Sequence, residues 1–247
     1  MQTLRTVEEL RRWSRCARKD AGHKDGCVIG LVPTMGALHA GHASLIRAAA
    51  ATCPHVAVSI FVNPTQFGPN EDFARYPRTF DADCALAHAE GAQVVFAPAV
   101  DELYPEGSAT FVDVEGISDR LDGRSRPGHF RGVATVVAKL LTAAEADQAF
   151  FGQKDAAQVA VLRRMVTDLC IGTKLVICPI VREADGLALS SRNIYLNPVE
   201  RKQALVLSRA VQRVELLVAG GERRARLAIL PAAPRGSERE PASALLG

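Results

Sequence analysis

Several features that mark particular protein classes are missing from this 247-residue sequence. Its six cysteines are scattered, with no CxxC pair and no Cys/His cluster, which excludes a zinc-ribbon spacing and argues against a disulfide-rich secreted scaffold. There is no run of roughly 18 apolar residues and no apolar leader after the polar, arginine-rich start, so neither a membrane span nor a signal peptide is expected. We therefore expect a reduced, cytoplasmic protein without a membrane partner.

An excess of one charge is also missing, because 30 Lys and Arg face 27 Asp and Glu. The small basic surplus lies in residues 201–247, which hold nine basic and four acidic side chains. A nucleic-acid partner would require a basic stripe on the folded body, and the distribution argues against one. Apolar residues make up 48% of the chain, which is enough to form a large core without stabilising cross-links.

Short apolar runs alternate with helical patterns along the chain. The runs are nearly continuous, which is typical of parallel strands covered on both faces, and they lie at residues 27–32, 56–62, 93–97, 148–151 and 175–181. Helices are expected at residues 6–19, 42–52, 80–90, 133–144 and 156–168. The alternation predicts an α/β fold with a doubly wound parallel sheet and ligands beyond the carboxyl ends of its strands. Cys27 and Cys178 lie in the apolar runs and are expected to be small core residues.

The pattern changes after about Val181. A strong helix is predicted at residues 197–219, with Pro198 in its first turn, and an Arg-, Ala- and Pro-rich segment follows. We expect one domain over residues 1–182 and a smaller, partial domain over residues 183–247. Its last part, from about residue 230 to 247, is expected to be disordered because prolines interrupt regular structure there.

The most informative motif is PTMGALHAGH at residues 33–42, which follows a buried strand and opens a helix. His39 and His42 are three residues apart, so both can face one ligand at the helix N-terminus. Free backbone N–H groups and the positive end of the helix dipole favour a phosphate there, and glycine lets the backbone approach it. The alternative is a turn capped by two histidines.

The segment FGQKD, residues 151–155, is followed one helical turn later by Gln158. Lys154 offers a cation for a phosphate, and Asp155 offers an acceptor for a ribose hydroxyl or an amine. A charge pair at the start of a helix is the alternative interpretation.

The segment DGLALSSRN, residues 185–193, places two hydroxyls and an arginine in one loop. Ser190, Ser191 and the planar guanidinium of Arg192 are suited to holding a phosphate. An ordinary polar loop would explain the same residues.

Two segments add polar groups near predicted strand ends or helix starts. Asn63 and Gln66, in FVNPTQF, follow a strand at the edge where such sheets bind ligands. Asp81 and Asp83 could help to hold Mg²⁺, which needs only one or two carboxylates, or could act as helix N-terminal charges. The basic, glycine-rich loop at residues 123–132 is either a lid over an anionic substrate or a surface loop.

In this order, the segments resemble the pantoate–β-alanine ligase (pantothenate synthetase) family from about residue 3 to about residue 218. PTMGALHAGH, SIFVNPTQF, YPRT, RPGHFRGV, FGQKD and DGLALSSRN all look like signatures of that family. The HxGH element alone would indicate only the wider HIGH-type nucleotidyltransferase superfamily. The resemblance implies a Rossmann-like first domain, a C-terminal lid and a homodimer.

The same resemblance implies a two-step reaction. Pantoate and Mg-ATP would form a pantoyl adenylate and pyrophosphate, and β-alanine would then displace AMP to give pantothenate. ATP is thus a substrate, and Mg²⁺ is the expected cofactor.

The resemblance also implies roles for individual residues. His42 would be the acid and His39 its partner on the phosphates, with Lys154 and Arg192 completing the catalytic set. Gln66 and Gln158 would hold pantoate. The assignments of Asn63 to substrate binding and of Asp83 to a metal come from the residue types and their positions, as described above. The ATP-binding set would be Met35, Gly36, Ala37, Leu38, His39, Ala40, Gly41, His42, Gly152, Gln153, Lys154, Asp155, Val181, Leu189, Ser190, Ser191 and Arg192.

The C-terminal segment departs from the family pattern. Residues 222–247 resemble nothing in the family's lid, so a shortened lid is expected. One alternative is therefore a nucleotide- and pantoate-binding protein with impaired ligase turnover. Another is an enzyme of the same mechanism acting on a different acid, although Gln66 and Gln158 together favour pantoate.

Overall fold

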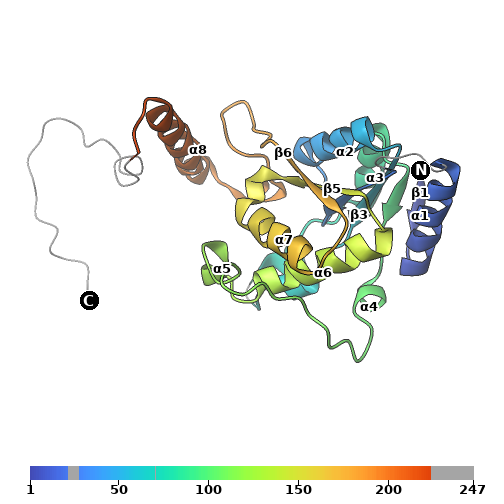
Figure 1. The fold of residues 1–247 in the computed structure, drawn as a ribbon. Coiled ribbons are helices and arrows are strands. Elements are labelled where there is room, and N and C mark those ends of the chain that lie inside the picture. Colours follow the sequence, from blue (N-terminus) through green and yellow to red (C-terminus); the bar gives the residue numbers. More distant parts are fainter. Residues whose placement is uncertain (22–27, 70, 224–247) are drawn as a thin grey trace, which may run out of the picture. The chain divides into compact units, whose positions relative to one another are not determined.

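A parallel β-sheet forms the centre of the computed structural model, which describes residues 1–21, 28–69 and 71–223. The strand order is β1-β4-β3-β2-β5-β6, and every pairing between these strands is parallel. Figure 1 shows helices on both sides of this sheet. The strands are β1 (Gln2–Leu4), β2 (Ile29–Thr34), β3 (His55–Ile60), β4 (Val94–Phe96), β5 (Gln148–Gly152) and β6 (Lys174–Cys178). The predicted α/β class with a parallel sheet is therefore confirmed.

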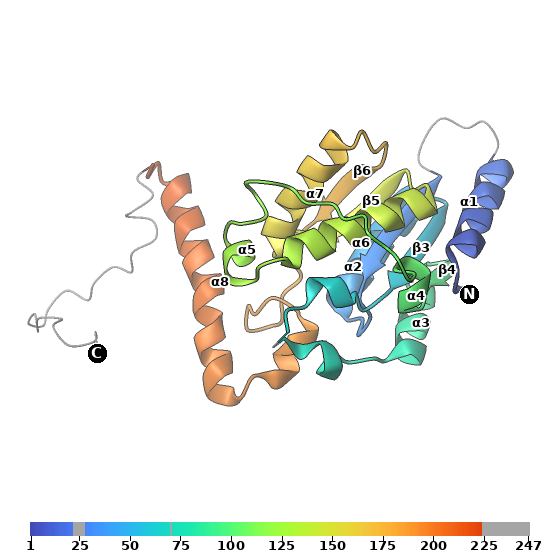
Figure 2. The ribbon, with the colours of Figure 1, turned by 90° about the horizontal axis from the view of Figure 1, so that it is seen from below.

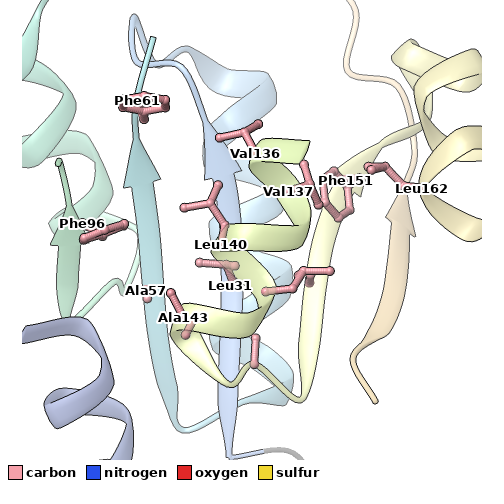
Figure 3. Packing of buried hydrophobic residues seen from close by; sticks show 14 of the residues in the cluster. Leu31, Ala57, Phe61, Phe96, Val136, Val137, Leu140, Ala143, Phe151 and Leu162 are labelled. Atoms are coloured by element: carbon pink, nitrogen blue, oxygen red, sulfur yellow. The ribbon is translucent and has the colours of Figure 1, made fainter. Parts of the chain in front are cut away.

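The central strands are apolar on both faces because helices cover both. On one face, α1 (Val7–Ala21), α6 (His129–Ala144) and α7 (Ala156–Asp168) contribute to the larger hydrophobic cluster. On the other face, α2 (Ala40–Thr52) and α3 (Phe80–Ala89) contribute to a second cluster. Figure 3 shows Val136, Leu140 and Ala143 of α6 beside Leu31 and Ala57 of the sheet. Periodicity in the sequence predicted all five helices.

Strand register brings distant motifs to one edge of the sheet. Thr34, at the end of β2, lies opposite Ile60 of β3, and Gly152 of β5 lies opposite Cys178 of β6. The segments that follow these strands begin at the same edge. They include the short helices η1 (Pro64–Gln66), η2 (Asp72–Arg75), α4 (Val100–Leu103), α5 (Asp122–Ser125), η3 (Gln153–Asp155) and η4 (Ser191–Tyr195).

One strand was not predicted from the sequence. β1, at residues Gln2–Leu4, is only three residues long and pairs with β4 at the edge of the sheet. Its first two residues are exposed and only Leu4 is buried, so it lacks the apolar run by which the other strands were found.

The chain divides into two units, and the second consists of Asp185–Leu187 with Leu196–Gly247. Its main described element is α8 (Pro198–Ala219), one uninterrupted helix (Figure 2). Asn197 caps this helix, since its Oδ1 accepts the N–H groups of Val199 and Glu200, while Glu200 accepts the N–H of Asn197. This box explains why the helix begins where Pro198 predicted it. Ala188–Tyr195 belong to the first unit, and the predicted disordered tail, 230–247, falls outside the described residues.

The expectation of fully reduced cysteines is wrong at one position, because Cys53 is disulfide-bonded. Cys16, Cys84, Cys170 and Cys178 are free thiols. The scattered spacing of the six cysteines gave no sign of this bond. Cys178 is buried as expected, and the predicted core position Cys27 lies outside the described residues. Within the described part of the chain, no helix combines the length and apolarity that crossing a membrane requires.

Candidate active site

A cavity of ≈ 200 Å³ lies beyond the carboxyl ends of the central strands. Its walls come from the segments after β2, β3 and β5, from α6, and from the loop before η4. The predicted site residues that line it are Met35, His39, His42, Asn63, Gln66, Lys154, Asp155, Gln158, Ser190, Ser191 and Arg192. Segments separated by more than a hundred residues therefore meet in one place.

A smaller hollow of ≈ 80 Å³ shares His39, His42, Lys154 and Asp155 with this cavity. Four more predicted residues line it, namely Gly41, Gly152, Val181 and Leu189. The Leu189 N–H donates to the Val181 carbonyl at 3.0 Å, which fixes this wall. The remaining predicted nucleotide residues line neither hollow; they are Gly36, Ala37, Leu38, Ala40 and Gln153.

The two histidines at the start of α2 are held by backbone donors. His39 is the N-cap, and its Nδ1 accepts the Gly41 N–H at 3.1 Å. His42 Nδ1 accepts the His39 N–H at 3.3 Å, and the two rings lie 4.1 Å apart. An accepting Nδ1 carries no hydrogen, so each neutral ring has its hydrogen on Nε2. The sequence left two alternatives open, a turn capped by two histidines and a histidine pair that faces a ligand. The hydrogen bonds at the start of α2 are compatible with both at once.

Burial makes both histidines neutral. The pKa of His42 is lowered to about 3, chiefly by desolvation and then by electrostatic interactions with His39 and Lys154. Desolvation also lowers the pKa of His39, with Lys154 adding to the effect. A neutral His42 suits hydrogen-bond donation to an anion better than the role of a charged acid that the family resemblance implied.

Two cationic side chains line the cavity, Lys154 from η3 and Arg192 from η4. Lys154 Nζ lies 3.2 Å from Asp155 Oδ1, and both side chains are partly exposed. The Arg192 guanidinium forms a two-point contact with Asp72, with both distances at 2.9 Å. That contact raises the pKa of Arg192 and lowers the pKa of Asp72. The Asp72 contact therefore keeps Arg192 positively charged, and Lys154 adds a second cationic side chain to the cavity wall.

Gln66 is oriented by its neighbours. Its Oε1 accepts a hydrogen bond from Asn63 Nδ2 at 3.2 Å, and its Nε2 lies 3.0 Å from Met35 Sδ. Asn63 is only 1% exposed, and its Oδ1 also accepts from the hydroxyls of Thr65 and Tyr104. Hydrogen bonds within the protein therefore satisfy the polar atoms of Asn63. Asn63 in turn orients the Gln66 side chain and forms part of the cavity wall.

The predicted lid loop also contributes to the wall. Arg126 forms a two-point ion pair with Glu71 at 2.6 Å, and its Nη1 lies 3.0 Å from His129 Nε2. His129 Nδ1 lies 2.8 Å from the Gln66 carbonyl oxygen, which makes it the donor there. Arg126 and His129 line the cavity together with Gln66, so this loop forms part of the cavity wall.

Some cavity residues had no assigned role at the sequence level. Tyr76 is buried, which raises its pKa, and its hydroxyl lies 3.5 Å from Ser191 Oγ. It belongs to YPRT, a family-like segment that gave no chemical clue on its own. The cavity also has an apolar wall, which was missed because its residues look like ordinary core residues in the sequence. They are Phe61, Val133, Val136, Val137, Leu140 and Phe151.

The environment of Asp83 does not fit a metal ligand. Its carboxylate is 3% exposed and accepts hydrogen bonds from the N–H groups of Ala37 and Leu38 and from the Thr79 hydroxyl. Asp81, two residues earlier, is exposed. Among the residues described, no group of three His, Cys, Asp or Glu side chains could hold a metal ion. Any Mg²⁺ would thus depend mainly on phosphates and water for its ligands.

A parallel sheet with a cation- and donor-lined cavity at its carboxyl edge defines an α/β enzyme with an anion-binding site. Residues 2–240 match the family model of pantoate–β-alanine ligase. The chain belongs to this family, as its motifs indicated.

Curated relatives agree with this assignment. The chain is 61% identical over 221 residues to a pantothenate synthetase of Koribacter versatilis, covering 90% of the chain and 74% of the relative. It is 67% identical over 195 residues to one of Acidobacterium capsulatum, covering 79% of the chain and 65% of the relative. The chain thus spans about two thirds to three quarters of these relatives.

Solved structures are similar as well. A pantothenate synthetase from Thermus thermophilus has a TM-score of 0.83 and 48% identity, over 93% of this chain and 79% of that one. A Francisella tularensis pantoate–β-alanine ligase, complexed with β-γ ATP and β-alanine, has a TM-score of 0.75 and 35% identity, over 89% and 79%.

Proposed function

We propose that this protein condenses pantoate with β-alanine at the expense of ATP, through a pantoyl adenylate. The observation that carries the proposal is the convergence of the two histidines, Lys154 and Arg192 on one cavity that Gln66 and Gln158 also line. The Francisella relative, which is complexed with a nucleotide and β-alanine, supports the choice of substrates.

In the first step, the pantoate carboxylate attacks the α-phosphorus of ATP and pyrophosphate leaves. Such a reaction needs donors and cations that neutralise charge as it spreads over the phosphate oxygens. His39 and His42 supply Nε2–H donors, while Lys154 and Arg192 supply positive charge. Mg²⁺, if bound, would neutralise part of the phosphate charge of ATP and would take most of its ligands from the phosphates and water.

The apolar wall suits the branched carbon skeleton of pantoate, and the two glutamines suit its hydroxyl groups. Val136 and Val137 of α6 supply an apolar surface, and Gln66 and Gln158 supply amide groups. We propose that Asn63 acts here by orienting Gln66, rather than by contacting the acid directly.

In the second step, the free amine of β-alanine attacks the acyl carbon of the adenylate and AMP leaves. The amine loses a proton as the amide forms, and AMP departs with the electron pair of the acyl–oxygen bond. The adenylate hydrolyses readily, so exclusion of water favours the second step. Gln66, whose carbonyl oxygen accepts a hydrogen bond from His129, is our candidate for the β-alanine side.

The test measures pyrophosphate release from Mg-ATP, first with pantoate alone and then with β-alanine. Pantoate-dependent release that becomes steady turnover with β-alanine is the expected result. ATP binding without any release would contradict ligase activity and support the alternative of a nucleotide- and pantoate-binding protein. A burst that β-alanine does not convert to turnover would place the defect in the second step.

We also propose a homodimer, as the family resemblance implied, and a cytoplasmic location, as the cysteine spacing indicated. Light scattering on the purified full chain, with cell fractionation of the native host, tests the two statements separately. A monomeric mass or a non-cytoplasmic fraction would contradict the corresponding one.

A further inference from the structure

We infer that Asp83 is a positioning residue that holds the turn before α2 and thereby presents His39 and His42 to the nucleotide. The nucleotide part of this inference rests on the proposed function. Asp83 lies in the first turn of α3, 46 residues from Ala37, and its side chain is buried against that turn. It lines neither the main cavity nor the hollow beside it.

The turn that Asp83 holds has an unfavourable backbone shape. Gly36 has φ 84° and Ala37 has φ 51°, so two consecutive residues are left-handed. Alanine disfavours this region because its Cβ approaches the carbonyl oxygen, and such a conformation persists only where the surroundings hold it. The turn thus needs an external partner.

Asp83 is that partner. Its Oδ2 accepts the Ala37 N–H at 2.9 Å, and its Oδ1 accepts the Leu38 N–H at 2.8 Å. The Thr79 hydroxyl donates to the same Oδ1 at 3.0 Å and fixes the carboxylate. A Cβ on Gly36 would lie 3.0 Å from Oδ2, so the backbone packs directly on the carboxylate.

The held residues lead directly into the histidine pair. Leu38 precedes His39, whose own N–H donates to His42 Nδ1 and so determines which nitrogen of His42 carries hydrogen. A turn that relaxes at residues 37 and 38 would move the His39 N–H away from His42. The donors presented to the nucleotide would then lose both their position and their tautomer.

A general helix-terminus effect does not explain these contacts. Asp81 lies in the same first turn of α3 and carries the same charge, yet its side chain is exposed. The variant Asp81→Asn is therefore a matched control: it removes one charge from the same helix end and leaves the turn untouched.

The experiment compares the full-length parent with Asp83→Asn and Asp81→Asn, using proton–nitrogen NMR of protein with ¹⁵N-labelled histidine. In Asp83→Asn we expect His39 and His42 to change shift and tautomer, while His55 and His88 keep their signals. The kcat is expected to fall by about 10²-fold, the scale associated with misplaced catalytic groups, with little change in the KM for β-alanine. Asp81→Asn should match the parent.

Thr79→Ala serves if Asp83→Asn does not fold, because it removes only the hydroxyl that fixes the carboxylate. It should change the same two histidine signals by a smaller amount. Unchanged His39 and His42 signals in the folded Asp83 or Thr79 variant would overturn the inference, as would an equal change in Asp81→Asn. The histidine signals need no turnover, so the result stands apart from the proposed activity, which the parent's pyrophosphate release tests alone.

Discussion

At the scale of single residues, the site depends on groups that are kept uncharged. Each histidine accepts a backbone N–H on Nδ1 and carries its hydrogen on Nε2, and burial opposes the addition of a second proton to the ring. A bound anion would thus meet two fixed dipoles and two cations held by ion pairs with Asp155 and Asp72, an arrangement that needs little reorganisation during reaction. This property is measurable without any ligand.

The depressed pKa of His42 predicts how stability depends on pH. The folded pKa of about 3 lies below the ordinary value of 6.5, so the unfolded chain binds a proton that the folded chain excludes. The contribution of His42 to the free energy of unfolding is fully present above pH 6.5. It is lost as the pH falls toward 3, at up to about 1.4 kcal/mol per pH unit. His42→Asn should remove this slope from the free energy of unfolding, as followed by denaturant titration at several pH values.

His88→Asn is the control for that measurement, because His88 is exposed on α3. It should keep the parental slope. A parental slope in His42→Asn would show that another group excludes the proton.

Gly41→Ala tests the His39 position. A Cβ at residue 41 would lie 2.8 Å from His39 Cε1 and 2.9 Å from Nδ1, so the ring must move. The lost cap costs about 1 kcal/mol, and alanine regains a similar amount of helix propensity, so the melting temperature should change little. ATP affinity, measured by calorimetric titration, should fall roughly tenfold, which corresponds to one lost hydrogen bond of about 1.4 kcal/mol.

Gly172→Ala provides the comparison, since a Cβ there meets no atom within 4 Å. It should bind ATP as the parent does. Equal ATP affinity in Gly41→Ala and Gly172→Ala would contradict the role assigned to His39.

At the scale of elements, the substrate wall depends on how closely α6 approaches η1. A Cβ on Gly132 would lie 2.4 Å from the Thr65 carbonyl oxygen and 2.7 Å from Gln66 Cα. Both are backbone atoms, so one of the two elements would have to shift. The Gly132 carbonyl also accepts from Asn63 Nδ2 at 3.1 Å, which joins the elements.

Gly132→Ala should therefore displace Gln66. We expect the free energy of unfolding to fall by about 1–3 kcal/mol, as for overpacked cores, and kcat/KM for pantoate to fall more than ATP affinity does. Denaturant unfolding and steady-state kinetics measure the two effects, with Gly172→Ala again as the control. If Gly132→Ala is destabilised but keeps the parental kcat/KM for pantoate, the contact between α6 and η1 does not control pantoate binding.

At the scale of the whole molecule, hydrophobic patterning was enough to predict the central strands, the covering helices and the edge of the sheet at which the cavity lies. It missed β1, which is too short to show a pattern. Motif chemistry also predicted that the histidines, Lys154 and Arg192 would share one site. Patterning could not predict which acidic groups pair with backbone, because the environments of Asp81 and Asp83 differ only after folding. The disulfide at Cys53 was missed for the same reason.

The missing side chain at position 132 also has an evolutionary meaning. Under the proposed function, the apolar residues of α6 and the Gln66 amide of η1 would both bound the acid, so the gap between these elements would limit the acids that fit. Variation at this single position, with compensation at Thr65 or Gln66, would alter that gap without touching the nucleotide residues. Substrate range and nucleotide use could then diverge independently in descendants of such a protein.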